Sequence, residues 1–131
     1  MAKQTAPSEK QRTARLARMT DLCESLPGAA HEPAGLGHIR FRVAKKVFAW
    51  FLNNHHGDGI YSICCKSTLA KQSELVRRHP EVVYVPKYVG KQGWVAARID
   101  LKDVAWELVN TLFVEAYRLQ APKRLLAELD G

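Results

Sequence analysis

The sequence predicts a single α+β domain in which a mostly antiparallel, five-stranded sheet has helices packed on one face. Segments with helical spacing of apolar residues and segments with two-residue alternation follow the order helix, three strands, helix, two strands, helix. This order favours hairpins and a meander over regular alternation of parallel strands with helices. The chain has 131 residues, 47% hydrophobic and 25% charged, which suits one globular core. We expect a basic, partly flexible arm over residues 1–15 that leads into the first helix, and one domain over residues 16–131.

The first expected element is a helix that ends at Pro27-Gly28. Ser8 and Gln11 have the spacing of a capping box at its start. Apolar residues then follow at helical spacing: Leu16, Met19, Leu22, Cys23 and Leu26. The next stretch, as far as Gly37, is rich in Ala, Gly and Pro and is predicted to be a loop.

A two-residue period begins at His38 and indicates a half-buried strand over residues 38–43, whose second face is basic. Residues 47–52 form an aromatic and β-branched run, which is typical of a strand. Only a short polar break separates the two runs. We therefore predict a hairpin with Lys45 and Lys46 at its tip.

Residues 60–65 are predicted to be the third strand, and a second helix should follow it. Ser67 or Thr68 can cap that helix, and Pro80 terminates it. The polar and apolar pattern between these residues is helical.

Two further strands are expected at residues 82–85 and 94–99, joined by a lysine-bearing loop over residues 86–93. Asp100 is predicted to cap the last long helix, which Pro122 interrupts. A broad apolar stripe along that helix would pack against the sheet.

The formal net charge of +7 is distributed unevenly along the chain. Residues 1–18 carry +4 and residues 37–98 carry +8, whereas residues 19–36 and 99–131 carry −3 and −2. Concentrated positive charge favours an anionic partner. The strand-and-turn half of the chain is therefore the candidate binding region.

The cysteines and the hydropathy of the sequence indicate the cellular compartment that suits the protein. Cys23, Cys64 and Cys65 are odd in number and two are adjacent, so reduced thiols are expected rather than disulfides. The strongest apolar run, residues 47–52, is far shorter than the roughly 20 residues of a membrane helix. The polar, basic start, residues 1–18, is unlike a secretory signal. We expect a cytoplasmic protein with no membrane contact.

Several short motifs occur in a set order from roughly Leu16 to Leu126. They are Leu26-Pro27-Gly28, Phe41-x-Val43-x-Lys45-Lys46-Val47-Phe48-Ala49, Lys66 after a strand, Val82 to Tyr88, Gly93-Trp94-Val95, Tyr117 and Ala121-Pro122-Lys123. In this order and spacing the chain resembles the MmcQ/YjbR-type family of small bacterial proteins. The resemblance implies a frataxin-like (CyaY-like) fold and DNA binding, in which hairpin loops approach the duplex as a double wing. It implies no catalytic residues. The chain departs from that family in its long basic arm and in residues 53–59.

The leading hypothesis is a non-catalytic nucleic-acid-binding protein for DNA, more than RNA, in which the two lysine-tipped loops and the N-terminal arm contact backbone phosphates. Its candidate residues are those of the two lysine loops, the arginine-rich strand face and one tryptophan: Lys45, Lys46, Lys87, Lys91, Arg40, Arg42, Arg98 and Trp94. Trp94 could stack on an unpaired base. Packing at the strand edge is the favoured alternative for that side chain.

Three alternative functions have weaker support in the sequence. His55, His56 and Asp58 include metal-ligand types, but no second cluster accompanies them, and we expect neither a metal nor another cofactor. Cys64 or Cys65 could be a nucleophile beside a histidine, although burial as a small apolar side chain is favoured. A small-molecule or protein-binding adaptor with a cleft beside the sheet is the main alternative to nucleic-acid binding.

Overall fold

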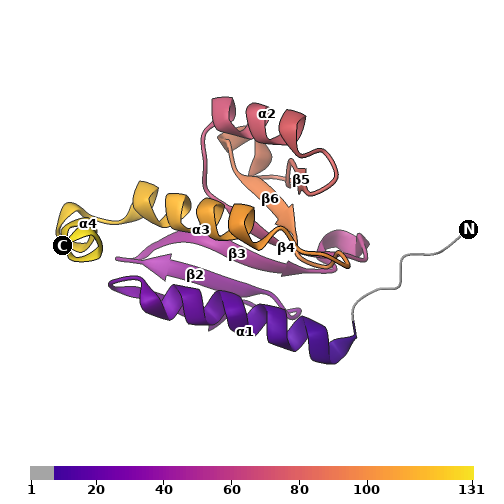
Figure 1. Ribbon diagram of the computed structural model, residues 1–131, viewed down its shortest axis with the longest axis horizontal. Coiled ribbons are helices and arrows are strands. Elements are labelled where there is room, and N and C mark those ends of the chain that lie inside the picture. The colour runs from indigo at the N-terminus through magenta and orange to yellow at the C-terminus, as the bar shows by residue number, and fades with distance from the viewer. Residues whose placement is uncertain (1–7) are drawn as a thin grey trace, which may run out of the picture.

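The computed structural model describes residues 8–131, which form one six-stranded antiparallel sheet and four α-helices (Figure 1). The strands lie in the order β1-β2-β3-β4-β6-β5. The elements are α1 (Glu9–Ser25), β1 (Ala29–Pro33), β2 (Ile39–Val43), β3 (Lys46–Asn53), β4 (Tyr61–Cys65), α2 (Leu69–Arg78), β5 (Val83–Tyr84), β6 (Val95–Arg98), α3 (Trp106–Gln120) and α4 (Lys123–Asp130), with short 3-10 turns η1 (His55–Gly57) and η2 (Gly90–Gln92). The predicted α+β class is confirmed.

The sheet has six strands rather than the five predicted, because the expected loop after the first helix contains β1. All five residues of β1 pair with β2, from Ala29 opposite Val43 to Pro33 opposite Ile39. Its sequence, AAHEP, has no alternation of large apolar residues that would predict a strand. The neighbouring strand β2 therefore imposes this conformation, and proline is tolerated because β1 lies at the sheet edge.

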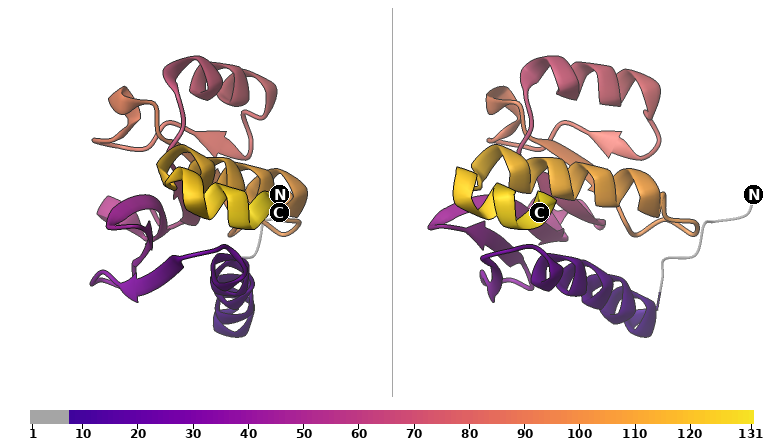
Figure 2. Two further views of the ribbon diagram at one scale, coloured as in Figure 1. Left: turned by 90° about the vertical axis from the view of Figure 1, so that its left-hand side faces the viewer. Right: turned by 60° about the vertical axis from the view of Figure 1, so that its left-hand side comes forward.

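Helices α1 and α3 pack against the same face of the sheet, and Figure 2 shows both of them on that side. The centre of this core is an aromatic cluster in which the Phe113 ring lies 5.0 Å from the rings of both Phe41 and Phe48. All three side chains are fully buried. Tyr117 packs its ring edge to face on Phe48, and its hydroxyl donates a 2.5 Å hydrogen bond to the Pro27 carbonyl.

A β-bulge in the β2–β3 hairpin lets one strand present two neighbouring side chains to this core. The pairing moves from Phe41 opposite Ala49 to Arg42 opposite Val47, so Phe48 has no partner on β2. Phe48 and Ala49 are both fully buried. The extra residue thus brings a second phenylalanine from the hairpin to Phe113.

The helix starts follow the predicted caps in two cases out of three. Ser8 and Gln11 form the expected capping box of α1, and Thr68 accepts the Lys71 N–H at the start of α2. The prediction that Asp100 caps the last long helix is wrong, because α3 begins at Trp106. Asp100 instead pairs with Arg98 on the preceding strand.

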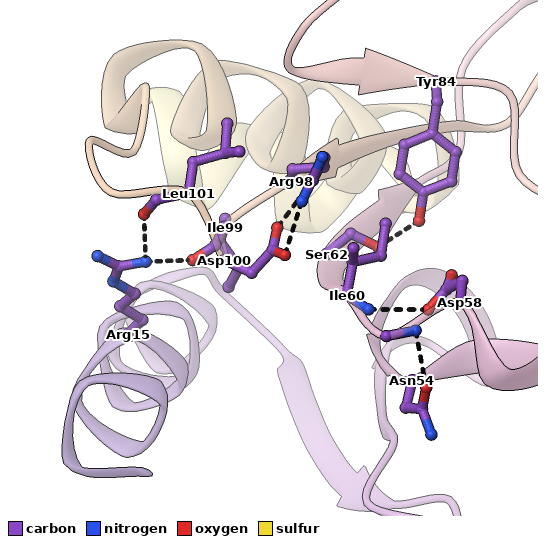
Figure 3. A network of polar contacts seen from close by, with 11 residues as sticks. Arg15, Asn54, Asp58, Ile60, Ser62, Tyr84, Arg98, Ile99, Asp100 and Leu101 are labelled. Atoms are coloured by element: carbon purple, nitrogen blue, oxygen red, sulfur yellow. Dashed lines mark hydrogen bonds and ion pairs between the residues drawn. The ribbon is translucent and has the colours of Figure 1, made fainter. Parts of the chain in front are cut away.

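The predicted N-terminal arm falls partly outside the described residues, which begin at Ser8. Residues 9–15 of that arm already belong to α1. Arg15 anchors this part of the helix, since its guanidinium donates to the Ile99 and Leu101 carbonyls at 2.8 and 2.7 Å (Figure 3). Within residues 8–131, every helix is too short or too polar to cross a bilayer.

Candidate nucleic-acid interface

The face of the sheet opposite α1 and α3, here called the open face, carries the predicted arginines. Cross-strand pairing places Arg40 beside Trp50, Trp50 beside Cys64 and Cys64 beside Ala96. A second, smaller cluster of buried side chains covers part of this face and contains Leu52, Cys64, Trp94 and Ala96. The open face is therefore arginine-rich at β2 and apolar at β4 and β6.

Arg40 and Arg42 share one carboxylate, which the unexpected strand β1 brings to them. Glu32 lies opposite Arg40 in the register, and its Oε1 accepts from Arg40 Nε at 3.0 Å and from Arg42 Nη1 at 3.1 Å. The Arg42 hydrogen bond, with the charges of both arginines, holds the pKa of Glu32 below its usual value. These two predicted contact residues are thus partly neutralised by Glu32.

Arg98 is also paired. Its guanidinium makes a two-pronged contact with the Asp100 carboxylate, both hydrogen bonds being 2.9 Å long (Figure 3). The Asp100 side chain is only 10% exposed, so the carboxylate of this ion pair is shielded from solvent. All three arginines predicted to bind phosphate therefore already have carboxylate partners.

The four predicted lysines behave differently. Lys45, Lys46, Lys87 and Lys91 are all exposed, and within residues 8–131 none of them lies within ion-pair distance of a carboxylate. Ala44 and Lys45 form the two-residue turn between β2 and β3, with φ of 47° and 74°. Positive φ at both positions is the geometry of a tight hairpin, so the turn presents Lys45 to solvent.

The second lysine loop does not project beside the hairpin. It runs along the open face, with Lys87 near His55, whose pKa it helps to lower, and Lys91 in the turn η2 that precedes Trp94. His55 lies two residues beyond the last residue of β3, Asn53, whereas Lys46 is the first residue of that strand. Eight extended residues span roughly 23 Å, so Lys87 and Lys46 lie at opposite ends of the sheet.

Lys91 instead lies at the same end of the sheet as the hairpin tip. β3 begins there, β4 ends there and β6 begins there, because the pairs β3–β4 and β4–β6 are antiparallel. Lys66 directly follows β4, and its N–H donates to the Phe48 carbonyl of β3 at 3.0 Å. We call these four residues toward one end of the sheet, Lys45, Lys46, Lys66 and Lys91, the lysine end. Lys66 was not a predicted site residue, since sequence order alone does not show which strand ends meet.

Buried contacts fix the loop that carries Lys91. The Gln72 side chain of α2 donates to the Gly90 and Trp94 carbonyls, each at 2.7 Å, and Gln72 is only 7% exposed. Gly93 has φ of 93°, and a Cβ at this position would lie 2.8 Å from the Thr68 carbonyl carbon. Glycine is therefore required where the loop meets the start of α2.

Trp94 packs in the sheet rather than presenting a stacking surface, since it is 7% exposed and belongs to the smaller core cluster. The favoured packing alternative is confirmed. The Lys66 ammonium lies 5.8 Å from the Trp94 ring centroid, a cation–π contact that orients this lysine. Trp50 is the more accessible tryptophan of the open face, and the Arg40 guanidinium lies 5.5 Å from its ring centroid.

The cysteines lack the features of a nucleophile. Cys64 and Cys65 face opposite sides of the sheet, as expected for successive strand residues, and each is 1% exposed. Burial raises the pKa of Cys23 and of Cys64 to about 12, and it also raises the pKa of Cys65. These thiols would remain protonated at neutral pH, which opposes thiolate chemistry.

The histidines of the 53–59 segment pack edge to face with one another and with His38. The His38 and His55 ring centroids are 5.5 Å apart, and those of His55 and His56 are 4.1 Å apart. In the part of the chain that the structure describes, no three His, Cys, Asp or Glu side chains converge to hold a metal ion. Asp58 accepts the Ile60 N–H at 3.1 Å (Figure 3).

Comparison with known proteins identifies the family. A YjbR family model matches residues 24–119. The chain belongs to the YjbR family. The crystal structure of Deinococcus radiodurans protein DR2400, described as a DUF419 domain, is similar to this YjbR-family protein with a TM-score of 0.66. The likeness covers 79% of this chain and 76% of that chain at 21% identity, and it therefore shows a shared fold. None of the curated proteins matches the sequence significantly.

Proposed function

We propose that this YjbR-family protein is a non-catalytic, cytoplasmic nucleic-acid-binding protein that holds the phosphate backbone at its lysine end. One observation carries the proposal. Three lysines of that end, Lys45, Lys46 and Lys91, are exposed and have no carboxylate partner within residues 8–131, whereas the arginines of the open face are paired. DNA is the preferred partner, in keeping with the binding that the family resemblance implies.

The chemistry of such an interface is electrostatic. Lysine ammonium groups that approach phosphates release condensed counterions, which makes the affinity strongly dependent on salt. Phosphate contacts position a protein without reading base sequence. Because the paired arginines and the buried Trp94 offer few free groups for base edges, the proposed binding has low sequence specificity.

The hairpin between β2 and β3 supplies the exposed turn of this interface, with Lys45 and Lys46 at its tip. The bulge at Phe48 fixes the hairpin to the aromatic core, so its tip is held rather than free. The second wing implied by the family resemblance has only Lys91 at this end, because Lys87 lies toward the opposite end of the loop. We therefore propose contact by one hairpin together with Lys66 and Lys91.

A salt-dependent binding titration tests the proposal. Labelled duplex DNA, single-stranded DNA and RNA should each be titrated by fluorescence anisotropy at several salt concentrations. Duplex DNA should bind with a Kd on the order of 1–100 μM near physiological salt, and log K should fall linearly with log salt. An absence of binding to all three at low salt would refute the proposal.

A further inference from the structure

A cavity of about 180 Å³ opens on the open face, at the end of β3 remote from the lysine end. Its walls are mostly apolar or aromatic, and its lining includes Trp50, Leu52, Cys64, Pro86 and Val89. An engineered apolar cavity of about 150 Å³ in another protein accepts benzene, so this space suits one small ring. The remaining lining residues are polar or lie at the rim: His38, His55, Lys87 and Tyr88.

The rim of the cavity is a built structure rather than a loose loop. Asn54 accepts the Gly59 N–H at 2.8 Å through its side chain, which closes the segment after β3 (Figure 3). Asn54 and His56 both have left-handed backbone conformations, with φ of 51° and 54°. The His56 ring packs 5.1 Å from the Tyr88 ring, so this segment and the loop after β5 meet at the cavity.

His38 supplies a neutral hydrogen-bond donor at this site. Its Nδ1 accepts the Asn53 N–H at 3.0 Å, which places the ring hydrogen on Nε2. Burial, followed by the charge of His56, lowers the pKa of His38, so the ring is neutral near pH 7. Within residues 8–131, the Nε2–H of His38 has no protein acceptor.

Lys87 supplies a positive charge at the same rim. It is exposed, lacks a carboxylate within ion-pair distance in residues 8–131, and lies near enough to His55 to oppose protonation of that ring. Asp58 also lies near His55 and acts on the pKa of that ring in the opposite direction to Lys87. One carboxylate oxygen of Asp58 accepts the Ile60 N–H at 3.1 Å. The cavity therefore combines an apolar interior with a cation and a neutral donor.

We propose that this cavity binds a small aromatic carboxylate, whose ring packs against Trp50 and Leu52 and whose carboxylate meets Lys87 and His38. An apolar pocket with a few placed polar groups is the usual composition of a small-molecule site. The charge of the ligand is set by Lys87, and its size is set by the volume of the cavity. The site is separate from the lysine end and does not depend on nucleic-acid binding.

A chemical-shift titration with two matched ligands tests the proposal. Benzoate and its uncharged analogue benzamide should be added to the 15N-labelled full chain. Benzoate should shift the Trp50 indole and the backbone amides of residues 52–56 and 87–89, with a Kd on the order of 1 mM for so small a ligand. Benzamide should bind at least about fivefold more weakly, because it cannot pair with Lys87.

Two exchanges at exposed lysines separate this site from the proposed nucleic-acid interface. Lys87→Gln should weaken benzoate binding about fivefold and leave benzamide binding unchanged. Lys91→Gln, the matched control at the lysine end, should leave benzoate binding unchanged and weaken DNA binding. Both side chains are exposed, so folding should be preserved.

Four results would overturn the cavity proposal. The first three are an absence of benzoate shifts at tens of mM, shifts that lie outside the cavity lining, and equal benzoate binding by wild type and Lys87→Gln. Each of these results leaves the DNA titration interpretable, because that titration depends on the other end of the sheet. Equal affinity for benzoate and benzamide would likewise exclude a carboxylate site.

Discussion

The two faces of the sheet differ in how far their large side chains are buried. The face toward α1 and α3 is sealed by fully buried rings, in which Phe41, Phe48 and Phe113 pack against one another. The open face carries partly exposed side chains, among them Arg40, Arg42 and Trp50, and the small cavity at one end. The first face holds the fold, and the second leaves room for ligands.

The comparison also shows that charge counted along a sequence differs from charge free to bind. The +8 middle segment includes three arginines of the open face, which Glu32 and Asp100 largely neutralise. Both carboxylates come from segments outside that middle region. Within residues 37–98, the exposed lysines Lys45, Lys46, Lys87 and Lys91 in turns and loops carry most of the charge that has no carboxylate partner in the described residues, and Lys66 and Arg77 carry the rest.

The largest expected effect is the difference in stability between core substitutions on the two faces. Phe113→Ala should lower the free energy of unfolding by about 3–5 kcal/mol, because it empties the centre of the aromatic cluster. Trp50→Ala should cost about 1–2 kcal/mol, because that ring is only partly buried. Urea unfolding of both variants measures the difference. Equal losses would mean that the open face contributes to the core as much as the helix-covered face does.

A smaller effect is expected from releasing the arginines of the open face. Arg42 lies beside the hairpin tip, since its Nη2 donates to the Lys45 carbonyl at 3.1 Å. Glu32→Gln should therefore tighten DNA binding and steepen the salt slope by about 0.9 for each arginine that reaches a phosphate.

Glu81→Gln is the matched control for this exchange. It removes the same charge from an exposed residue that makes no ion pair within residues 8–131. Salt slopes from anisotropy titrations of both variants decide the outcome. Identical slopes for the two variants would show that the Glu32 pairing does not limit binding.

The smallest expected effect is a dependence of stability on pH from the histidines at the cavity. Burial lowers the pKa of His38 and of His55 below the ordinary value of 6.5, and His56 adds to this while Asp58 opposes it. The unfolded chain then binds more protons than the folded chain as the pH falls through 6.5, so stability decreases on the acidic side. The melting temperature should drop between about pH 7.5 and pH 5.5.

His38→Gln is expected to reduce this acid-side drop. Glutamine can still accept the Asn53 N–H through its side-chain oxygen, but it does not titrate. Thermal melts at the two pH values compare the variant with wild type. An unchanged drop would assign the pH dependence to other groups.

Much of the fold followed from local sequence patterns. The capping box at Ser8, the Thr68 cap, and the runs that became β2, β3, β4 and β6 all depend on nearby residues, and the structure confirms them. Strand β1 was missed because its five residues have no alternating apolar pattern. They form a strand because they pair with β2. Asp100 was assigned to a helix cap because the sequence does not show that Arg98 engages it.

The candidate site was predicted in its composition more than in its arrangement. The turn lysines Lys45 and Lys46 were found at the hairpin tip because a short polar break between two strands is a local feature. The neutralisation of Arg40 by Glu32 depends on the pairing of β1 with β2 and could not be predicted locally. Lys66 joins the lysine end only because β4 ends beside the start of β3.

The claim that free lysines at strand ends form the interface is tested most directly by two triple variants of equal charge. One variant is Lys45→Ala, Lys46→Ala, Lys91→Ala at the lysine end. The control is Lys10→Ala, Arg77→Ala, Lys102→Ala, which are exposed positions elsewhere. Lys10 and Lys102 lie near the opposite end of the sheet, where Arg15 of α1 binds the carbonyls that follow β6.

The measurement is the salt slope of duplex DNA binding by wild type and both triple variants. The account predicts that the lysine-end variant loses about 0.9 from the slope for each lysine removed and binds about a hundredfold more weakly near physiological salt, while the control stays near wild type. Equal losses in the two variants would contradict the account, because net charge rather than the lysine end would then govern binding.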